Sequence, residues 1–387
     1  MKKAYLFLGI VLLLWGTNIV IGQDHCWVAP CDPCGGHATS SPFTFDNWAF
    51  GGWVEMGVYT NSHGSNSNGP MHVESRRRTD FLMSQLYFFG EREMDARRGF
   101  DWGARADLVY GVDRDVMQTV GDQTFDYNWG TNRHGYGMSA YQLYGTLGYR
   151  DFSVKAGKFY GLVGWEAATS PDNFFYSHSY CYAIEPATHM GVLATRNLTD
   201  RLSVNGGWVT GENSSFKNPH GNKAVLTGFT YALTDDATMY YQFNGGRQGD
   251  GETRLNYFVQ SLVFEWEMTD RFTYVLQYNL RNDNERKGAG RFSSYGLNNH
   301  FLYKLNDRWG AGMRVEWLRE NGGADYHLIT PTVADFYQVT WGLNWNPRRN
   351  VSIRPEVRYD WCKGASPFAK GTRSNQISGG CGIVVSF

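Results

Sequence analysis

Residues 336–361 read FYQVTWGLNWNPRRNVSIRPEVRYDW, two runs in which apolar and polar side chains alternate. Residues 346–350, the sequence NPRRN, separate the runs and have the composition of a turn. Successive side chains of a β-strand point to opposite faces, so the stretch predicts a hairpin with one aromatic and aliphatic face and one charged face. The apolar face begins and ends in aromatic residues, as in strands whose rings lie at the two surfaces of a bilayer. This pattern favours a transmembrane hairpin over a hairpin of a soluble sandwich.

The same alternation recurs from about residue 46 to the C-terminus. The run from Trp309 to Trp317 would extend roughly 30 Å as a strand. Tilted by about 40°, it would cover roughly 23 Å of the membrane normal, close to the apolar band of outer-membrane barrels. A tight turn of Thr or Asn followed by Asp recurs with its first residue at positions 199, 234, 269 and 306. The turns are thus 35 to 37 residues apart. Repeats of this length also occur in solenoids and propellers, but each unit here contains two alternating strands, one short turn and one long polar loop.

We therefore predict an all-β fold, a transmembrane antiparallel β-barrel of about sixteen strands in an up-and-down meander with short periplasmic turns and long external loops. The pattern is weakest for the strands near residues 47–60, 80–91, 189–196 and 223–232. Pro355 predicts a bulge or a broken pair in mid-strand, because proline has no N–H to donate. The long loops are expected near residues 61–78, 111–137, 160–187, 211–222, 245–253, 281–293, 319–335 and 362–374.

The N-terminus has the features of an exported protein. Lys2 and Lys3 precede an apolar run that ends at Trp15, which predicts a signal peptide over residues 1–22. A membrane anchor is the alternative. We expect residues 23–45, which are rich in Cys, Pro and Gly, to form a periplasmic lead-in and residues 46–387 to form the barrel. For the lead-in cysteines a local disulfide is favoured over a redox or zinc site in an oxidising compartment; they are Cys26, Cys31 and Cys34.

Composition excludes several classes of function. Aromatic residues make up 16% of the 387 residues and charged residues 19%, and the net charge is −1. This balance gives no argument for nucleic-acid binding. The ten histidines have no metal-ligand spacing, so we predict neither a metal nor another cofactor.

A sixteen-stranded barrel encloses a water-filled lumen, through which solutes diffuse according to pore diameter and to the charges on the wall. The predicted pore-lining residues are the ionisable residues on the inward face of the strands. These charges could instead pair with one another on a wetted wall, and both roles are compatible. The residues are Arg105, Asp107, Lys155, Lys158, Arg314, Glu316, Arg354, Glu356 and Arg358.

The loop at residues 160–187 differs from the others because it is rich in aromatic residues. Such a loop buries its rings only by packing against something, so we predict that it folds inward and narrows the pore. Glu166, Asp172 and Glu185 are then expected to face basic residues of the wall. The alternative is a packed external lid.

Several short motifs resemble the OmpL-like family of outer-membrane β-barrel porins. They are Gly51-Gly52-Trp53-Val54-Glu55, Gln85-Leu86-Tyr87, Gly157-Lys158-Phe159 and Gly164-Trp165-Glu166, and the terminal Phe387 also fits. The resemblance covers roughly residues 45–387 and implies a channel in the bacterial outer membrane. It supplies neither a substrate nor catalytic residues.

We therefore predict a porin, a passive diffusion channel for small hydrophilic solutes or ions, in contact with outer-membrane lipid. A homo-oligomer is suggested by analogy only. The main alternative is a nonconducting barrel that serves as a surface adhesin or receptor, given its long polar loops. An outer-membrane hydrolase is less well supported, because inward-facing His300 has no serine partner that the sequence singles out.

Overall fold

The computed structural model describes residues 43–45, 47–64, 79–119, 125–132, 134–215, 221–249, 254–285, 291–321 and 333–387. The predicted signal peptide, residues 1–22, and the predicted lead-in up to residue 42 lie outside the described residues. Residues 43–45 form a short strand, so sheet structure begins within the last part of the predicted lead-in.

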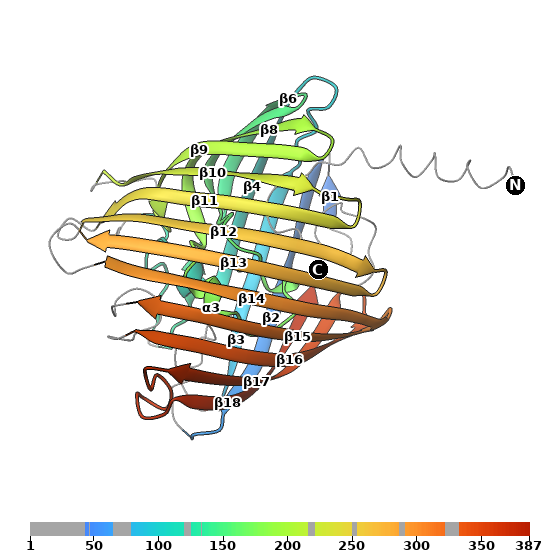
Figure 1. Ribbon diagram of the computed structural model, residues 1–387. Helices are drawn as coiled ribbons and strands as arrows, with labels where there is room; N and C mark the ends of the chain where they lie inside the picture. Colours follow the sequence, from blue (N-terminus) through green and yellow to red (C-terminus); the bar gives the residue numbers. More distant parts are fainter. Residues whose placement is uncertain are drawn as a thin grey trace, which may run out of the picture.

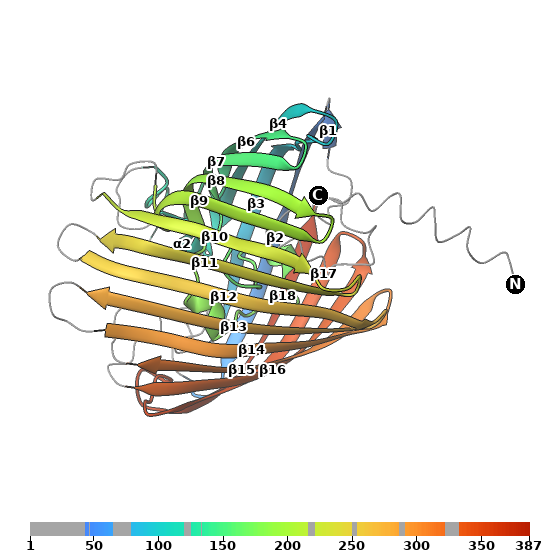
Figure 2. The same ribbon diagram turned by 45° about the horizontal axis from the view of Figure 1, so that its top comes forward.

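Almost all of the described chain is β-sheet, and Figures 1 and 2 show the strands curving round into one wall. The strands are β1 (Phe43–Phe45), β2 (Trp48–Asn61), β3 (Thr79–Arg92), β4 (Phe100–Gly111), β5 (Gly137–Ser139), β6 (Leu143–Tyr149), β7 (Phe152–Tyr160), β8 (Thr188–Thr199), β9 (Leu202–Glu212), β10 (Lys223–Ala232), β11 (Ala237–Gly249), β12 (Arg254–Thr269), β13 (Phe272–Glu285), β14 (Arg291–Asn306), β15 (Trp309–Asn321), β16 (Ala334–Arg348), β17 (Val351–Lys363) and β18 (Asn375–Ser386). The helical elements are α2 (Arg114–Met117), η1 (Ser170–Asp172) and α3 (Tyr180–Ala183). Over the described ranges, no helix has the length and apolarity needed to span a membrane.

The sheet closes on itself because the last strand, β18, pairs antiparallel with β2. The sheet contains eighteen strands, and these correspond to sixteen staves of the barrel. The difference of two arises because β1 only adds a short pairing to β2, while β5 and β6 lie end to end along β4. The predicted sixteen-stranded antiparallel barrel is thus confirmed. The four strands with the weakest sequence pattern are present as β2, β3, β8 and β10.

The two faces of the wall follow the alternation in the sequence. Trp341 pairs with Val357 on the outer face, and these side chains are 52% and 53% exposed. On the neighbouring rung Thr340 pairs with Arg358 on the inner face, and both are fully buried. One residue of register therefore separates the lipid-facing surface from the interior.

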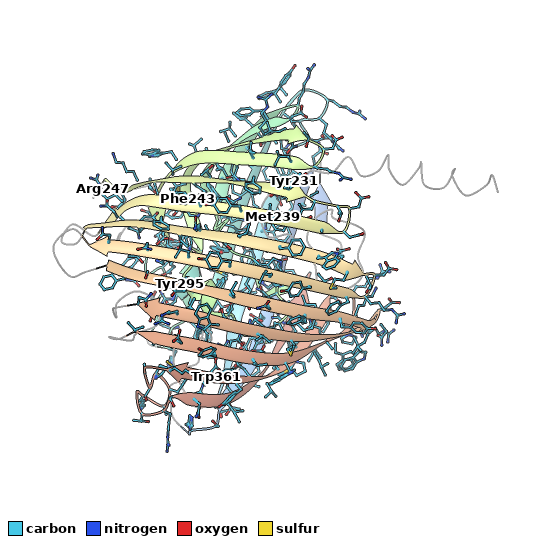
Figure 3. The ribbon with its side chains drawn as sticks, viewed as in Figure 1. Tyr231, Met239, Phe243, Arg247, Tyr295 and Trp361 are labelled. Atoms are coloured by element: carbon cyan, nitrogen blue, oxygen red, sulfur yellow. The ribbon has the colours of Figure 1, made fainter. Side chains whose placement is uncertain are left out.

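Aromatic residues mark both ends of the outer apolar band. Trp309 and Trp345 stack across β15 and β16 near the short turns, with ring centroids 5.6 Å apart. Tyr337 and Trp361 stack at the other end of the same wall, with centroids 5.1 Å apart. Figure 3 shows Trp361 together with Tyr295 on the outer face. These rings lie where the aromatic girdles of an outer-membrane barrel contact the bilayer surfaces.

Pro355 coincides with a local gap in the ladder between β16 and β17. The register passes from Gly342↔Glu356 to Trp345↔Ile353 and leaves Pro355 unpaired with β16, while its pairing with Cys381 of β18 is kept. The predicted broken pair is therefore present, and the register of β16 against β17 is the same on both sides of it. The missing N–H of proline accounts for it.

A second irregularity separates β5 from β6. Residues 140–142 interrupt this stave, and the ladder between β6 and β7 ends at Leu143↔Lys158. Tyr141 shares the apolar parity of β6, so it would be expected to face lipid. Instead it is 2% exposed, and its hydroxyl donates to Ala187 O at 3.1 Å. Beside this break Lys158 forms a buried ion pair, with its Nζ 2.8 Å from Asp126 Oδ2, which also accepts from Ser139 at the end of β5.

The assignment of faces predicts the effect of a charge at the middle of β17. We expect Val357→Arg to lower the free energy of unfolding by about 2–4 kcal/mol, because an arginine at the bilayer midplane of a barrel costs that much. Denaturant titration in lipid vesicles measures the change. The control Ser366→Arg adds the same charge at an exposed position outside the strands and should change the free energy by less than about 0.5 kcal/mol. Equal effects of the two substitutions would contradict the assignment.

Candidate functional site

The loop between β7 and β8, residues 161–187, lies inside the barrel, and we call it the inner loop. Every residue from 172 to 177 and from 179 to 184 is buried. The loop contacts walls that lie far apart around the barrel, since Ser170 bonds to Glu55 of β2 and Glu185 accepts from Gln277 of β13. Figure 1 places its helix α3 behind the strands of the near wall. The structure thus puts this loop in the lumen rather than over it as a lid.

Two glutamates of the wall accept hydrogen bonds from backbone N–H groups of the inner loop. Glu316 of β15 accepts from Tyr180 N at 2.7 Å and from Cys181 N at 2.6 Å. Glu356 of β17 accepts from Tyr176 N at 2.9 Å and from Ser177 N at 3.2 Å. Buried backbone donors need such partners. The loop has only the short turns η1 and α3, which leave most of its N–H groups without a partner of regular secondary structure.

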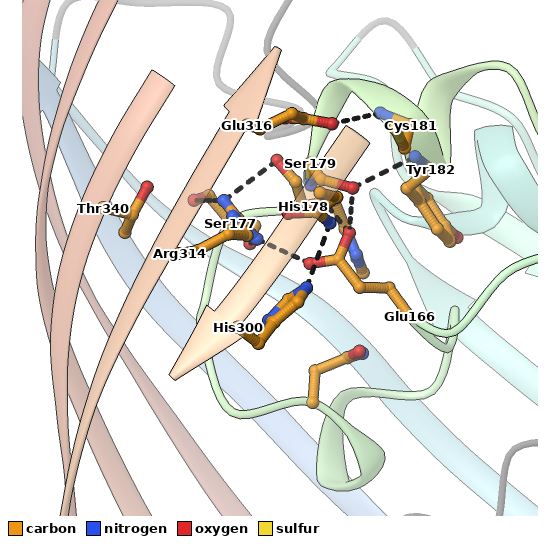
Figure 4. A network of polar contacts seen from close by, with 12 residues as sticks. Glu166, Ser177, His178, Ser179, Cys181, Tyr182, His300, Arg314, Glu316 and Thr340 are labelled. Atoms are coloured by element: carbon orange, nitrogen blue, oxygen red, sulfur yellow. Dashed lines mark hydrogen bonds and ion pairs between the residues drawn. The ribbon is translucent and has the colours of Figure 1, made fainter. Parts of the chain in front are cut away.

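Arginines of the same wall donate to the backbone carbonyl groups of the loop. Arg314 donates to Ser177 O at 2.7 Å and to His178 O at 3.2 Å, and Arg358 donates to His178 O at 2.6 Å. Figure 4 shows Arg314 and Glu316 reaching from one strand to the loop. The wall therefore supplies acceptors and donors in alternation along the loop backbone.

A third arginine fixes the first turn of the loop. Arg354 Nη1 donates to Ser170 O at 2.6 Å and to Asn173 O at 2.9 Å, while its Nη2 pairs with Glu55. Ser170 Oγ also donates to Glu55. The segment around η1 is held between β17 and β2, two strands that flank β18 in the closed sheet.

One acidic residue of the loop forms an ion pair with this wall. Glu166 Oε1 lies 2.6 Å from Arg314 Nη1, and its Oε2 accepts from Ser179 N at 2.8 Å. Burial alone would raise the pKa of Glu166, but the charges of Arg314 and of nearby histidines outweigh it and hold the pKa at about 2.

Inward-facing glycines make room for the aromatic rings of the loop. A Cβ at Gly57 would lie 2.5 Å from the Tyr176 ring, and a Cβ at Gly382 would lie 2.6 Å from it. A Cβ at Gly312 would collide with Phe174. The rings of Phe174 and Tyr176 therefore pack directly against the wall backbone at these glycines, in space that any larger side chain would occupy.

Apolar packing completes the docking. Trp165, Phe174 and Phe175 of the loop form one buried cluster with inward residues of the wall, Val263 and Leu302 among them. The inner face here is apolar, whereas a water-filled lumen predicts a polar one. The difference follows from the loop, because the wall at this height faces protein rather than water.

The other predicted site residues lie in separate places. Arg105 and Asp107 form an ion pair on β4, at 2.8 Å, and Asp107 also accepts from Gln142 at 2.8 Å. Lys155 of β7 is half-buried, with its Nζ 4.4 Å from the centre of the Tyr144 ring. Lys158 is fully buried in its ion pair with Asp126. The predicted set therefore does not form one lining.

The expectation that all three loop carboxylates face basic wall residues is correct for Glu166 and wrong for Glu185. Within the described part of the chain, the hydrogen bonds that Glu185 accepts come from two neutral amides, Gln277 and Asn279, the latter at 2.5 Å. Spacing along the chain gave no indication of which stave this end of the loop reaches. Asp172 accepts a hydrogen bond from Thr169 of its own turn.

Sequence reasoning missed Glu55, Asp360 and the glycines. Asp360 lies 2.8 Å from Arg358 and accepts from the Tyr180 hydroxyl at 2.5 Å. Each of these positions falls on the inward parity of its strand, so the alternation contained the signal. A glycine in mid-strand is also a known mark of close approach by another part of the chain.

A small pocket of about 30 Å³ remains between the inner loop, the start of the loop after β4, and the wall. Glu55, Arg354, Asp113, Tyr176 and His178 are among the residues that line it. A volume of this size holds about one or two water molecules. Within the described residues, no three His, Cys, Asp or Glu side chains are placed to hold a metal ion.

Comparison with known proteins adds a family and a set of folds. The family model described as "Putative beta-barrel porin-2, OmpL-like" matches residues 47–387. No curated protein sequence gives a significant match.

Among solved structures, the anion-selective porin from Comamonas acidovorans has a TM-score of 0.60 and 8% identity, over 88% of this chain and 99% of that chain. The outer-membrane channel DcaP of Acinetobacter baumannii has a TM-score of 0.57 and 9% identity, over 90% and 100%. The trimer form of OmpT from Vibrio cholerae has a TM-score of 0.56 and 11% identity, over 88% and 99%. At these identities the likeness concerns the fold alone.

The glycine contacts predict that a side chain at Gly312 displaces the loop. Overpacking costs about 1–3 kcal/mol, so we expect Gly312→Val to raise the population of the undocked loop roughly 5- to 150-fold. Limited proteolysis of the reconstituted barrel within residues 161–187 measures this population. Gly379→Val is the matched control, since its Cβ would meet only ordinary contact at 3.6 Å. Unchanged cleavage of the Gly312→Val variant would contradict the docking.

The Glu166–Arg314 pair predicts a pH dependence. The pKa of Glu166 is lowered from 4.5 to about 2, so the pair stabilises the docked loop fully above pH 4.5 and loses its effect as the pH falls through about 2. The thermal midpoint of wild type should therefore exceed that of Glu166→Gln above pH 4.5, and the two midpoints should converge toward pH 2. A difference that grows on acidification would show that the sign is wrong.

Proposed function

The chain belongs to the OmpL-like family of β-barrel porins, proteins of the bacterial outer membrane, and we propose that small hydrophilic solutes or ions diffuse through its lumen past the inner loop, which forms the constriction. The observation that supports this role is the set of bonds from Arg314, Arg354, Glu316 and Glu356 to the loop backbone. A loop fixed across the lumen sets the diameter of the passage, and diameter is the first determinant of what a wide barrel admits.

The predicted pore-lining charges then have two kinds of role. Those of β15 and β17 hold the loop, and their charge is largely neutralised by partners at close range. Lys155 and the Arg105–Asp107 pair lie away from these contacts and remain candidates for shaping the field along the passage. We propose a channel role rather than an enzymatic one, because the buried charges of the loop are occupied in docking.

A nonconducting barrel that serves as a surface receptor is the second candidate. The burial of nearly the whole inner loop between residues 172 and 184 favours it. In that case the inner loop would act as a plug, and the long loops would carry the binding function. A homo-oligomer is a further proposal for either role, suggested by a solved structure of similar fold that is described as a trimer.

Deletion of residues 170–182 tests the constriction. This segment contains η1, the buried rings of Phe174, Phe175 and Tyr176, and the start of α3, so its removal should widen the lumen and raise single-channel conductance severalfold in planar bilayers. The control deletion removes residues 369–372 from the tip of the loop between β17 and β18 and should leave conductance unchanged. Conductance equal to wild type after the first deletion would contradict the constriction. Wild-type protein that folds and never conducts would support the receptor instead.

A further inference from the structure

The docking of the inner loop differs between its two ends. From Glu166 to Cys181 the loop is tied by the arginines and glutamates of β15 and β17. The preceding residues approach the other wall through apolar side chains, since Leu162 packs in one cluster with Val209 of β9 and Leu226 of β10. The β9–β12 wall thus holds the loop mainly by apolar contact.

Beneath this apolar contact, the inner face of β9–β12 carries a row of uncharged polar side chains. Asn205, Gly228, Gln242 and Ser261 occupy one continuous rung, because each pairs with the next across the sheet. The three polar members, which we call the amide row, are 5%, 3% and 2% exposed. The inward positions two residues away along these strands are uncharged as well.

The amide row is buried without partners. Among the described residues, no hydrogen bond reaches either polar atom of the Asn205 amide, either polar atom of the Gln242 amide, or Ser261 Oγ. Thr230, one step further along β10, is in the same condition. Buried polar groups are almost always paired, so such a group requires a partner that enters from the lumen. On the opposite wall Asn344 and Ser352 are in the same condition near the turn between β16 and β17, whereas Thr340 in mid-strand donates to Gln338 at 2.5 Å.

From this difference in docking, together with the unpartnered amide row, we propose that the permeation path runs past the amide row, between the β9–β12 wall and the first part of the inner loop, and that it favours small uncharged solutes bearing hydroxyl or amide groups. This inference rests on the proposed channel function. Separation of the loop from this wall breaks the apolar contacts of Leu162 with Val209 and Leu226 and lets the amide row bond to water or solute. Separation from β15 and β17 would leave several buried charges unpaired.

Ser261→Cys and Thr340→Cys form a matched pair for testing the path. Both positions face inward and are at most 2% exposed, but only Ser261 belongs to the amide row. A sulfonate-bearing methanethiosulfonate reagent added to the reconstituted channel should react with the Ser261→Cys variant. A unit negative charge about 4 Å from a passing ion favours a cation and disfavours an anion by about 1 kcal/mol each even in water, so the cation-to-anion permeability ratio should rise about 30-fold. The Thr340→Cys variant and wild type should not respond. A response at Thr340→Cys without one at Ser261→Cys would overturn the path.

Two further measurements separate the possible failures. Gln242→Asp introduces a charge on the amide row without a reagent and should shift the permeability ratio in the same direction; an unchanged ratio in both this variant and the labelled Ser261→Cys variant would overturn the path. In liposome swelling, arabinose should enter severalfold faster than gluconate through wild-type protein, and equal or reversed rates would overturn the preference. Wild-type protein with neither swelling nor conductance would instead contradict the proposed function itself.

Discussion

A loop enclosed by a barrel has to find hydrogen-bond partners for its backbone, and this requirement organises the interior of the protein. Strands satisfy one another around the closed wall, but the inner loop has only short helical turns of its own. Its N–H groups bond to Glu316 and Glu356, and its carbonyl groups bond to Arg314, Arg354 and Arg358. The conspicuous charges of β15 and β17 are therefore first of all partners for a backbone.

That use of charge changes what the lumen presents to a solute. A guanidinium shared among a carboxylate and two carbonyl groups contributes much less to the field of a pore than a free one. The walls on the two sides of the loop consequently differ, because the charges of β15 and β17 bond to the loop, whereas β9 and β10 contact it through apolar side chains. Glycines opposite Phe174 and Tyr176 fix how deeply the loop lies.

Alternation along the strands was enough to predict the closed sheet, its strand number and the face on which Arg314, Glu316 and Arg358 lie, because a strand has a strict period of two. It could not predict which staves the loop would reach. Glu185 therefore has amide partners where basic ones were expected, and Lys158 has Asp126 from a distant loop. The break that turns Tyr141 inward also has no local signal that distinguishes it from a continuous strand.

Hydrogen exchange of the backbone amides in lipid-embedded protein tests most directly whether the inner loop is docked. If the carboxylates of Glu316 and Glu356 hold the amides of residues 176, 177, 180 and 181, these amides should exchange as slowly as those of the adjacent strands. Exposed Ser366 and Lys370, which lie outside the strands, provide the fast reference within the same molecule. Exchange of the inner-loop amides as fast as this reference would contradict the account.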